Sequence, residues 1–312
     1  MPSLLHRKTE DRRLWRSRGQ VPPPIREKQI ARYPDTTNRD QGVSLRDAPF
    51  AFGYRLLAFV LCYCSTTVNA TDCTAIRAYE RVEVSYVYDG DTVKLADGRK
   101  LRFIGINTPE IGRHGKANQA LATQARTFLN DLLNEHNRTL NLQSGTEEHD
   151  HYGRLLAHAF LETGSNVAVQ LLDAGLATTL VIPPNTWSVD CYQQHENDAR
   201  SASRGLWSLP AYQPLDSATL QRDTKGFRIV HGRITGIRHT RYNVWLDLNR
   251  TLRVRVSNKD LSNFEPGYLD DLEGKNVEVR GWIKSGRDGL RVNVRHPAAL
   301  RILATEASSR TK

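Results

Sequence analysis

The stretch DGDTVKLADGRKLRFIGINTPE, residues 89–110, indicates a β-hairpin that carries several charged side chains. Its first four residues form a turn signal directly after an alternating strand-like run, so Asp91 is expected where one strand passes into the next. The Asp-Gly pair at 97–98 is typical of a tight hairpin turn between two further strand-like runs. Arg102 is therefore predicted on a strand that pairs with the strand beginning at Asp91.

The end of this stretch, Asn107-Thr-Pro-Glu110, favours a helical turn or a fixed loop. The predicted hairpin then brings together the carboxylates of Asp91 and Glu110, the amide oxygen of Asn107 and the guanidinium of Arg102. This combination predicts a functional site at one end of the hairpin.

Four motifs together resemble those of the staphylococcal nuclease family. They are the DGDT turn, the arginine on the paired strand, N-T-P-E where the family has D-T-P-E, and Asp150-His-Tyr-Gly-Arg154, which is similar to D-x-Y-G-R. The resemblance covers residues 81–207. It implies an oligonucleotide/oligosaccharide-binding (OB) barrel and a calcium-dependent nuclease that cuts DNA and RNA with little sequence preference, leaving 3′-phosphate ends.

The resemblance also implies the role of each site residue. Calcium ligands would come from Asp91, from Asn107 and from the backbone carbonyl of Thr108. Glu110 corresponds to the candidate general base, and Arg102 and Arg154 would grip the scissile phosphate through forked hydrogen bonds. We expect Asp91 and Glu110 to face a solvent-filled site. Taken singly, each of these residues could instead cap a turn, begin a helix or be a solvated charge.

Two departures from the family pattern bear on the site. Asn107 replaces an aspartate, which keeps an oxygen ligand but removes a negative charge, so weaker calcium binding is expected. Residues 180–184, Leu-Val-Ile-Pro-Pro, stand where tyrosines stack near the nucleotide in the type protein. The histidines at 149, 151 and 158 could suggest zinc, but their motif already has a phosphate role.

The basic charge of the chain is unevenly distributed. The formal net charge is +10; residues 1–50 hold 11 Lys/Arg against 6 Asp/Glu, residues 71–221 hold 13 against 18, and residues 222–312 hold 19 against 10. The C-terminal third is therefore expected to provide the surface that attracts a polyanion.

The first 70 residues are predicted to lie outside the folded domains. Residues 1–50 are rich in Arg, Pro and polar residues without an apolar period, and indicate disorder or a leader created by a start site placed too far upstream. Residues 51–70 resemble a secretory signal peptide cleaved after Ala70. An uncleaved anchor and a buried helix remain alternatives, although the apolar run 56–64 is much shorter than the ~20 residues that span a bilayer.

Four cysteines are present, and Cys62 and Cys64 lie inside the predicted signal. Cys73 and Cys191 would then be the remaining pair, which an oxidising compartment would allow to form a disulfide. Two unrelated thiols are the alternative.

The fold class predicted for the whole chain is mainly β with helices (α+β). Residues 75–210 predict a five-stranded OB-type barrel with helices at 116–135, 166–174 and 190–204 and strands that include 139–143 and 155–162. After a linker-like segment at 210–214, residues 222–305 predict a second OB-like barrel. Its strands are expected at 227–237, 244–248, 252–256, 277–283 and 290–294, with a short helix at 264–272 between the third and fourth.

The second predicted barrel carries candidate nucleic-acid-binding residues. Arg253 and Arg255 alternate along one strand, and Arg291 and Arg295 along another, so each pair is expected to share one face. With Trp245 nearby, a basic groove with a stacking aromatic side chain would result. Docking to a protein or to the cell envelope, or a role as an inert spacer, remains open.

These observations predict an exported, periplasmic or secreted monomer that acts on DNA and RNA and is not held in a membrane once its signal is removed. The alternative from another functional class is a non-catalytic nucleic-acid-binding protein of the same fold. Retention of Asp91, Arg102, Glu110 and Arg154 argues against that alternative.

Overall fold

A computed structural model of the chain describes residues 73–75, 80–286 and 288–303. Every described residue belongs to one compact unit, which lies within residues 65–312. The predicted leader at 1–50 and export signal at 51–70 lie outside the described residues. Within the described part, no helix has both the length and the apolar character needed to cross a membrane.

Five strands of the N-terminal half close into a barrel in the order β1-β2-β3-β6-β5. They are β1 Glu80–Val87, β2 Thr92–Leu95, β3 Lys100–Phe103, β5 Thr139–His149 and β6 Leu155–Phe160. β3 and β6 run parallel, and the other neighbouring pairs are antiparallel. β4 Gly105–Asn107 and β7 Thr178–Leu180 form a separate two-stranded sheet. The predicted hairpin is thus part of a closed barrel.

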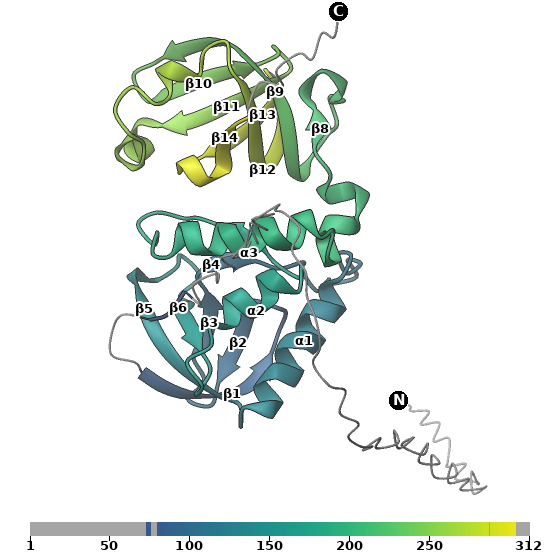
Figure 1. Cartoon of the computed structure of the whole chain (residues 1–312), viewed down its shortest axis with the longest axis vertical. Helices are drawn as coiled ribbons and strands as arrows, with labels where there is room; N and C mark the ends of the chain where they lie inside the picture. The colour runs from purple at the N-terminus through teal and green to yellow at the C-terminus, as the bar shows by residue number, and fades with distance from the viewer. Residues whose placement is uncertain (1–72, 76–79, 287, 304–312) are drawn as a thin grey trace, which may run out of the picture. The chain divides into compact units, whose positions relative to one another are not determined.

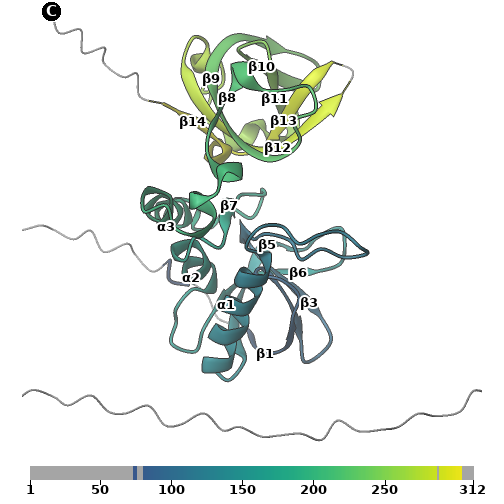
Figure 2. The ribbon, with the colours of Figure 1, turned by 90° about the vertical axis from the view of Figure 1, so that its right-hand side faces the viewer.

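Three α-helices cover this first barrel: α1 Ala122–Glu135, α2 Val167–Asp173 and α3 Val189–Ser201. Figures 1 and 2 show α1 running along one side of the barrel, and its buried Ala125, Leu129 and Leu133 belong to the barrel core. The predicted start of this helix at 116 is wrong. Leu121, the residue before α1, has a left-handed backbone (φ 64°), and residues 110–120 form a loop instead.

Five strands of the C-terminal half close a second barrel because β9 pairs with both β10 and β12. The barrel strands are β9 Gly226–His239, β10 Asn243–Leu248, β11 Leu252–Ser257, β12 Asn276–Gly286 and β13 Gly289–Val294. β11 and β13 are parallel, which matches β3 and β6 of the first barrel. Two short strands, β8 Leu215–Asp216 and β14 Leu300–Ile302, extend the second sheet. The predicted fold class, two OB-type barrels with few helices, is confirmed.

Alternation of side chains explains why the second barrel forms. Leu252, Val254 and Val256 of β11 are buried while the residues between them are partly exposed, as expected for a strand with one face in a core. The helix predicted at 264–272 is wrong. The segment between β11 and β12 instead contains two short 3₁₀ helices, Asn258–Asn263 and Asp270–Leu272.

Two ion pairs join α3 to β12 of the second barrel. Arg200 donates two hydrogen bonds of 2.8 Å to Glu278, and Arg280 donates two to Glu196, one of them 2.7 Å long. Glu196 and Arg200 lie one helical turn apart on α3, and Glu278 and Arg280 lie two residues apart on β12. The two side chains of each element therefore point to the same side of that element. The glutamate of each element therefore faces the arginine of the other, which makes the contact complementary in charge.

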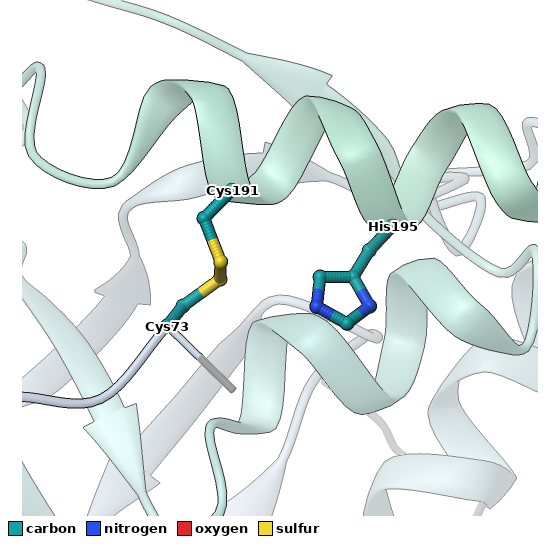
Figure 3. Close-up of side chains that lie close together, drawn as sticks. All are labelled: Cys73, Cys191 and His195. Atoms are coloured by element: carbon teal, nitrogen blue, oxygen red, sulfur yellow. A yellow bond between two sulfur atoms is a disulfide. The ribbon is translucent and has the colours of Figure 1, made fainter. Parts of the chain in front are cut away.

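A disulfide joins Cys73 to Cys191 of α3, the pair suggested by the cysteine count. Figure 3 shows the ring of His195 beside it. These three side chains lie close enough together to suggest a metal site. The two sulfurs are bonded to each other and His195 Nδ1 pairs with Asp173 Oδ1 at 2.8 Å, so the group is a structural link and not a set of thiolate ligands. The link holds the start of the described chain against α3.

Candidate active site

The predicted site residues gather at one end of the first barrel. Asp91 lies in the turn between β1 and β2, and Arg102 lies on β3 opposite Thr92. The turn approaches Thr108 so closely that a Cβ at Gly90 would lie 2.7 Å from the Thr108 methyl group, which explains the glycine at that position. Hairpin pairing and this close approach bring Asp91 next to Thr108, which is 17 positions further along the chain.

The carboxylate of Asp91 organises the centre of the site. Its Oδ2 accepts hydrogen bonds from the backbone N–H of Thr108 at 2.7 Å and from the Thr108 hydroxyl at 3.0 Å. Its Oδ1 lies 3.0 Å from Arg102 Nε and also accepts from Thr92 Oγ1. Asp91 is only 2 % exposed, so the expectation that it faces a solvent-filled site is wrong. The barrel holds the Asp91 side chain in place, because its two carboxylate oxygens accept hydrogen bonds from four donors.

Asn107 and the Thr108 carbonyl lie next to this centre. Arg102 donates to Asn107 Oδ1 at 3.4 Å, and Asn107 Nδ2 donates to the Thr108 carbonyl at 3.2 Å. The three residues predicted as ligands, Asp91, Asn107 and Thr108, are therefore linked directly or through Arg102. Arg102 is committed to Asp91, Asn107 and the Phe103 carbonyl.

An open cleft of about 490 Å³ lies beside this cluster, and we call it the catalytic cleft because two of the residues predicted to be catalytic line it. Glu110 and Arg154 both line it, together with Tyr88, Asp89 and Lys100. Glu110 is exposed, as predicted. Of the two arginines predicted to grip phosphate, Arg154 therefore lines the cleft, whereas Arg102 acts within the cluster behind it.

The motif at 150–154 explains the position of Arg154. Asp150 accepts from the Arg154 backbone N–H at 2.9 Å and from Arg154 Nε at 2.7 Å. Gly153 allows the tight turn between them, because its φ of +73° is in the left-handed region that favours glycine. No hydrogen bond from the two terminal nitrogens of Arg154 to another described residue is present. The fork of the guanidinium is therefore available to a phosphate.

Asp89 is a site residue that sequence reasoning treated only as part of a turn. It is buried, it lines the catalytic cleft, and its Oδ1 accepts from the Asp91 backbone N–H at 3.2 Å. Burial, and then the charges of Asp91 and Glu110, raise the pKa of Asp89 to about 7. The signal in the sequence was the pair of acids flanking one glycine, which places two carboxylates in a single turn.

Glu110 shows the same crowding of negative charge. Partial burial of its carboxylate raises its pKa, the charge of Asp91 raises the pKa further, and Arg102, Arg113 and Arg154 oppose the shift. Carboxylates that raise the pKa values of one another are stabilised when a cation lies between them.

The side chains fit a hard cation. The oxygen atoms gathered here come from carboxylates, the amide of Asn107 and the carbonyl of Thr108, and oxygen ligands of these kinds suit calcium or magnesium. Cysteine sulfur is absent from this part of the described structure, and His158, one of the three histidines considered for zinc, is buried against Tyr192 at a distance of 3.0 Å. The donor set therefore fits an oxygen-preferring ion.

The candidate nucleic-acid-binding residues of the second barrel divide into two groups. Trp245, Arg253, Arg255 and Arg291 occupy the partly exposed or exposed positions of β10, β11 and β13, with Trp245 opposite Arg255 and Arg253 opposite Arg291. The guanidinium of Arg253 lies 5.5 Å from the centre of the Trp245 ring. These four side chains thus share the outer face of the barrel.

Arg295 departs from the predicted arrangement. β13 ends at Val294, and Arg295 forms an ion pair with Asp260 at 3.0 Å while also donating to the Pro183 carbonyl of the first domain at 3.2 Å. The expectation that Arg291 and Arg295 share one strand face is therefore wrong. Strand alternation holds only as far as the strand continues.

Comparison with known proteins supports the resemblance noted from the motifs. A family model described as staphylococcal nuclease homologue matches residues 100–209. Endonuclease YncB of Bacillus subtilis (strain 168) is 32 % identical over 135 residues, which cover 42 % of this chain and 63 % of that protein. The thermonuclease of Staphylococcus intermedius is 31 % identical over 128 residues, which cover 40 % of this chain and 74 % of that protein.

Another similar protein is the SPbeta prophage-derived endonuclease YokF of B. subtilis (strain 168), which is 31 % identical over 135 residues. That match covers 42 % of this chain and 45 % of YokF. The chain thus spans less than two thirds of the length of either B. subtilis endonuclease.

Proposed function

Because the chain belongs to the staphylococcal nuclease family, we propose that it is an exported, calcium-dependent nuclease. It would hydrolyse phosphodiester bonds of DNA and RNA with little sequence preference and leave 3′-phosphate ends. The observation that carries this proposal is the catalytic cleft, in which Glu110 and Arg154 lie beside the cluster built around Asp91.

Arg154 would bind the scissile phosphate. Its Nε is held by Asp150, which orients the guanidinium and leaves the terminal nitrogens for two parallel hydrogen bonds to phosphate oxygens. Because these donors are in place before the reaction, they can stabilise the charge that develops on the phosphate in the transition state.

Glu110 would accept a proton from the attacking water. Partial burial and the charge of Asp91 raise the pKa of its carboxylate, which makes it a better base near neutral pH while it is still ionised. Its backbone N–H donates to Gln119 Oε1 at 3.1 Å, so the loop 110–120 holds the residue in place.

Asp91, Asn107 and the Thr108 carbonyl would hold the cation. A bound calcium ion would neutralise negative charge on the phosphate. Calcium accepts six to eight oxygen ligands in flexible geometry, which suits a set that mixes a carboxylate with neutral oxygens. Arg102 would act chiefly by orienting Asp91 and Asn107, since it contacts both.

The second barrel would add affinity for the substrate. Its face with Trp245, Arg253, Arg255 and Arg291 combines an aromatic ring with cations, the composition that suits a nucleic-acid backbone and its bases. Docking to a protein or to the envelope would be the alternative role for this face.

Two features support an exported, periplasmic or secreted protein. Residues 51–70 resemble a signal peptide, and the Cys73–Cys191 disulfide suits an oxidising compartment. A monomer without stable membrane insertion after removal of the signal completes the proposal.

The test compares the full chain with its Glu110→Gln variant on plasmid DNA and on RNA, with added calcium and with chelator. We expect cleavage of both by the parent chain with calcium, no cleavage with chelator, and a loss of orders of magnitude in rate for Glu110→Gln. Glu83→Gln is the matched control, because Glu83 is exposed on β1 and does not line the catalytic cleft. Equal rates for both variants would show that the cleft is not the catalytic site, whereas binding without cleavage would favour a non-catalytic binding protein.

A further inference from the structure

A second hollow of about 450 Å³ lies between β1 and α1, and we call it the β1–α1 groove. Tyr86 comes from β1, Arg126 and Asn130 come from α1, and Arg138 follows that helix. Tyr86 is 45 % exposed, so its ring is accessible to a ligand. None of the roles assigned above uses this groove.

Two neighbouring aromatic rings lie between the groove and the catalytic cleft. The centres of the Tyr86 and Tyr88 rings lie 5.1 Å apart in an edge-to-face arrangement. Tyr88 lines the catalytic cleft and Tyr86 lines the β1–α1 groove. A chain bound at the cleft can therefore pass along the two tyrosines into the groove.

Cations surround both rings. The guanidinium of Arg126 lies 5.3 Å from the centre of the Tyr86 ring, and its terminal nitrogen donates to the Tyr86 hydroxyl at 3.0 Å. Lys100 and Arg113 lie 5.5 Å and 5.4 Å from the centre of the Tyr88 ring. The path between the two hollows therefore combines aromatic faces with positive charge.

The cations of the groove lack acidic partners. Arg138 donates to Asn130, Asn134 and the Val84 carbonyl, which are all neutral. No acidic residue is among the groove's lining residues, and neither Arg126 nor Arg138 forms an ion pair with a described carboxylate. Residues 71–221 nevertheless hold 13 Lys/Arg against 18 Asp/Glu. The positive charge is thus local to the groove, as expected of a site for an anionic chain.

We propose that the β1–α1 groove binds the nucleotides of a single-stranded DNA or RNA substrate that continue beyond the scissile phosphate. Bases would stack on Tyr86 and Tyr88, and phosphates would contact Arg126 and Arg138. A single strand fits because its bases are free to stack on protein rings, whereas the bases of a duplex stack on each other. This proposal rests on the proposed nuclease function, which places the scissile phosphate in the catalytic cleft.

The first experiment measures how cleavage depends on substrate length. A nucleoside nitrophenyl phosphodiester serves as the minimal substrate and is compared with single-stranded oligothymidylates of increasing length. For the parent chain, we expect KM to fall as the strand becomes long enough to enter the groove. Tyr86→Ala should remove about 5- to 150-fold of that gain, the usual contribution of one stacked base, and leave the minimal substrate unchanged.

Two further variants separate stacking from charge. Tyr86→Phe keeps the ring and should retain most of the gain with length. Arg126→Ala should weaken binding of long strands and reduce the slope of log K against log salt by about 0.7 for one lost phosphate contact. Arg81→Ala is the control for charge, because Arg81 lies on the same strand, pairs with Glu162 and does not line the groove.

A binding experiment tests the groove apart from catalysis. Fluorescence anisotropy of a labelled oligothymidylate in chelator should show the same loss of affinity, about 5- to 150-fold, for Tyr86→Ala, even if the protein cleaves nothing. If the parent chain cleaves neither substrate but Tyr86→Ala still lowers the affinity for the oligothymidylate, the proposed nuclease function is overturned and the groove proposal is supported. The groove proposal is overturned if Tyr86→Ala binds the oligothymidylate as tightly as the parent chain does. It is also overturned if Tyr86→Ala affects the minimal and the long substrates equally.

Discussion

Replacing Glu196 by glutamine should destabilise the protein strongly, because it leaves a buried arginine without its counter-charge. The side chain of Glu196 is 2 % exposed and that of Arg280 is 10 % exposed. The Glu196 carboxylate accepts two hydrogen bonds from Arg280 and two from Thr179, through the backbone N–H at 2.8 Å and the hydroxyl at 2.7 Å. Every oxygen of this carboxylate is therefore engaged in the contact between α3 and the second barrel.

The magnitude follows from the burial of both partners. Breaking a buried ion pair by removing one partner costs about 3–5 kcal/mol, because the remaining charge is neither solvated nor paired. That is a large share of the ~5–15 kcal/mol by which a domain is typically stable. Replacing both partners, as in Glu196→Gln with Arg280→Met, removes the stranded charge and should recover much of the loss.

Urea unfolding followed by tryptophan fluorescence provides the free energies for this double-mutant cycle. Glu162→Gln is the control, because the Arg81–Glu162 pair is exposed and its loss should cost only ~0–1 kcal/mol. The reasoning is refuted if Glu196→Gln costs no more than Glu162→Gln, or if the effects of the two substitutions simply add. Either result would mean that Arg280 is solvated and that this pair does not join α3 to the second barrel.

Three further predictions concern the metal, the pH dependence and the second barrel. Asn107→Asp should lower the calcium concentration at half-maximal activity, because it adds a formal charge beside the ion; an unchanged calcium titration would show that Asn107 is not a ligand. Burial lowers the pKa of His158 from its usual 6.5 to about 3, so the unfolded chain takes up the proton first as the pH falls below 6.5, and stability is lost progressively down to about pH 3. The free energy of unfolding of the parent chain should therefore fall by about 2 kcal/mol more between pH 7 and pH 5 than that of His158→Gln, and parallel curves would contradict this. Arg253→Ala combined with Arg255→Ala should reduce the slope of log K against log salt on duplex DNA by about 1.8, for two phosphate contacts, with cleavage at saturating substrate retained; an unchanged slope would favour a docking role for that face.

Local pattern was sufficient for much of the fold and for part of the site. Turn residues at 89–92 and 97–98, together with alternating apolar positions, predicted the hairpin that pairs Thr92 with Arg102. Alternation also predicted the five strands of the second barrel, because the period of a strand can be read directly along the chain. Local pattern failed in two places of the second barrel. The strand has already ended before Arg295, and a 3₁₀ turn stands in the segment 264–272 where a helix was expected.

Helix pattern failed at the start of α1 for a reason that concerns the site. Residues 116–121 were expected to be helical, yet they belong to the loop after Glu110. Gly112 N–H donates to Asn118 Oδ1 at 2.9 Å, and Glu110 N–H donates to Gln119 Oε1. Side-chain bonds to the backbone compete with helix formation, and apolar periodicity does not report them.

The sequence by itself determined that Asp91, Arg102 and Glu110 belong to one hairpin and the loop after it, since their spacing and turn residues are local properties of the chain. Only the tertiary structure decided that Asp91 is buried under four donors, that Arg154 lines the catalytic cleft while Arg102 lies behind it, and that Asp89 joins the acidic group. The tertiary structure also decided that α3 contacts β12 and that a groove lies between β1 and α1. These features depend on which side chains face each other across elements far apart in the chain, and burial and electrostatic shifts arise from that arrangement rather than from sequence spacing.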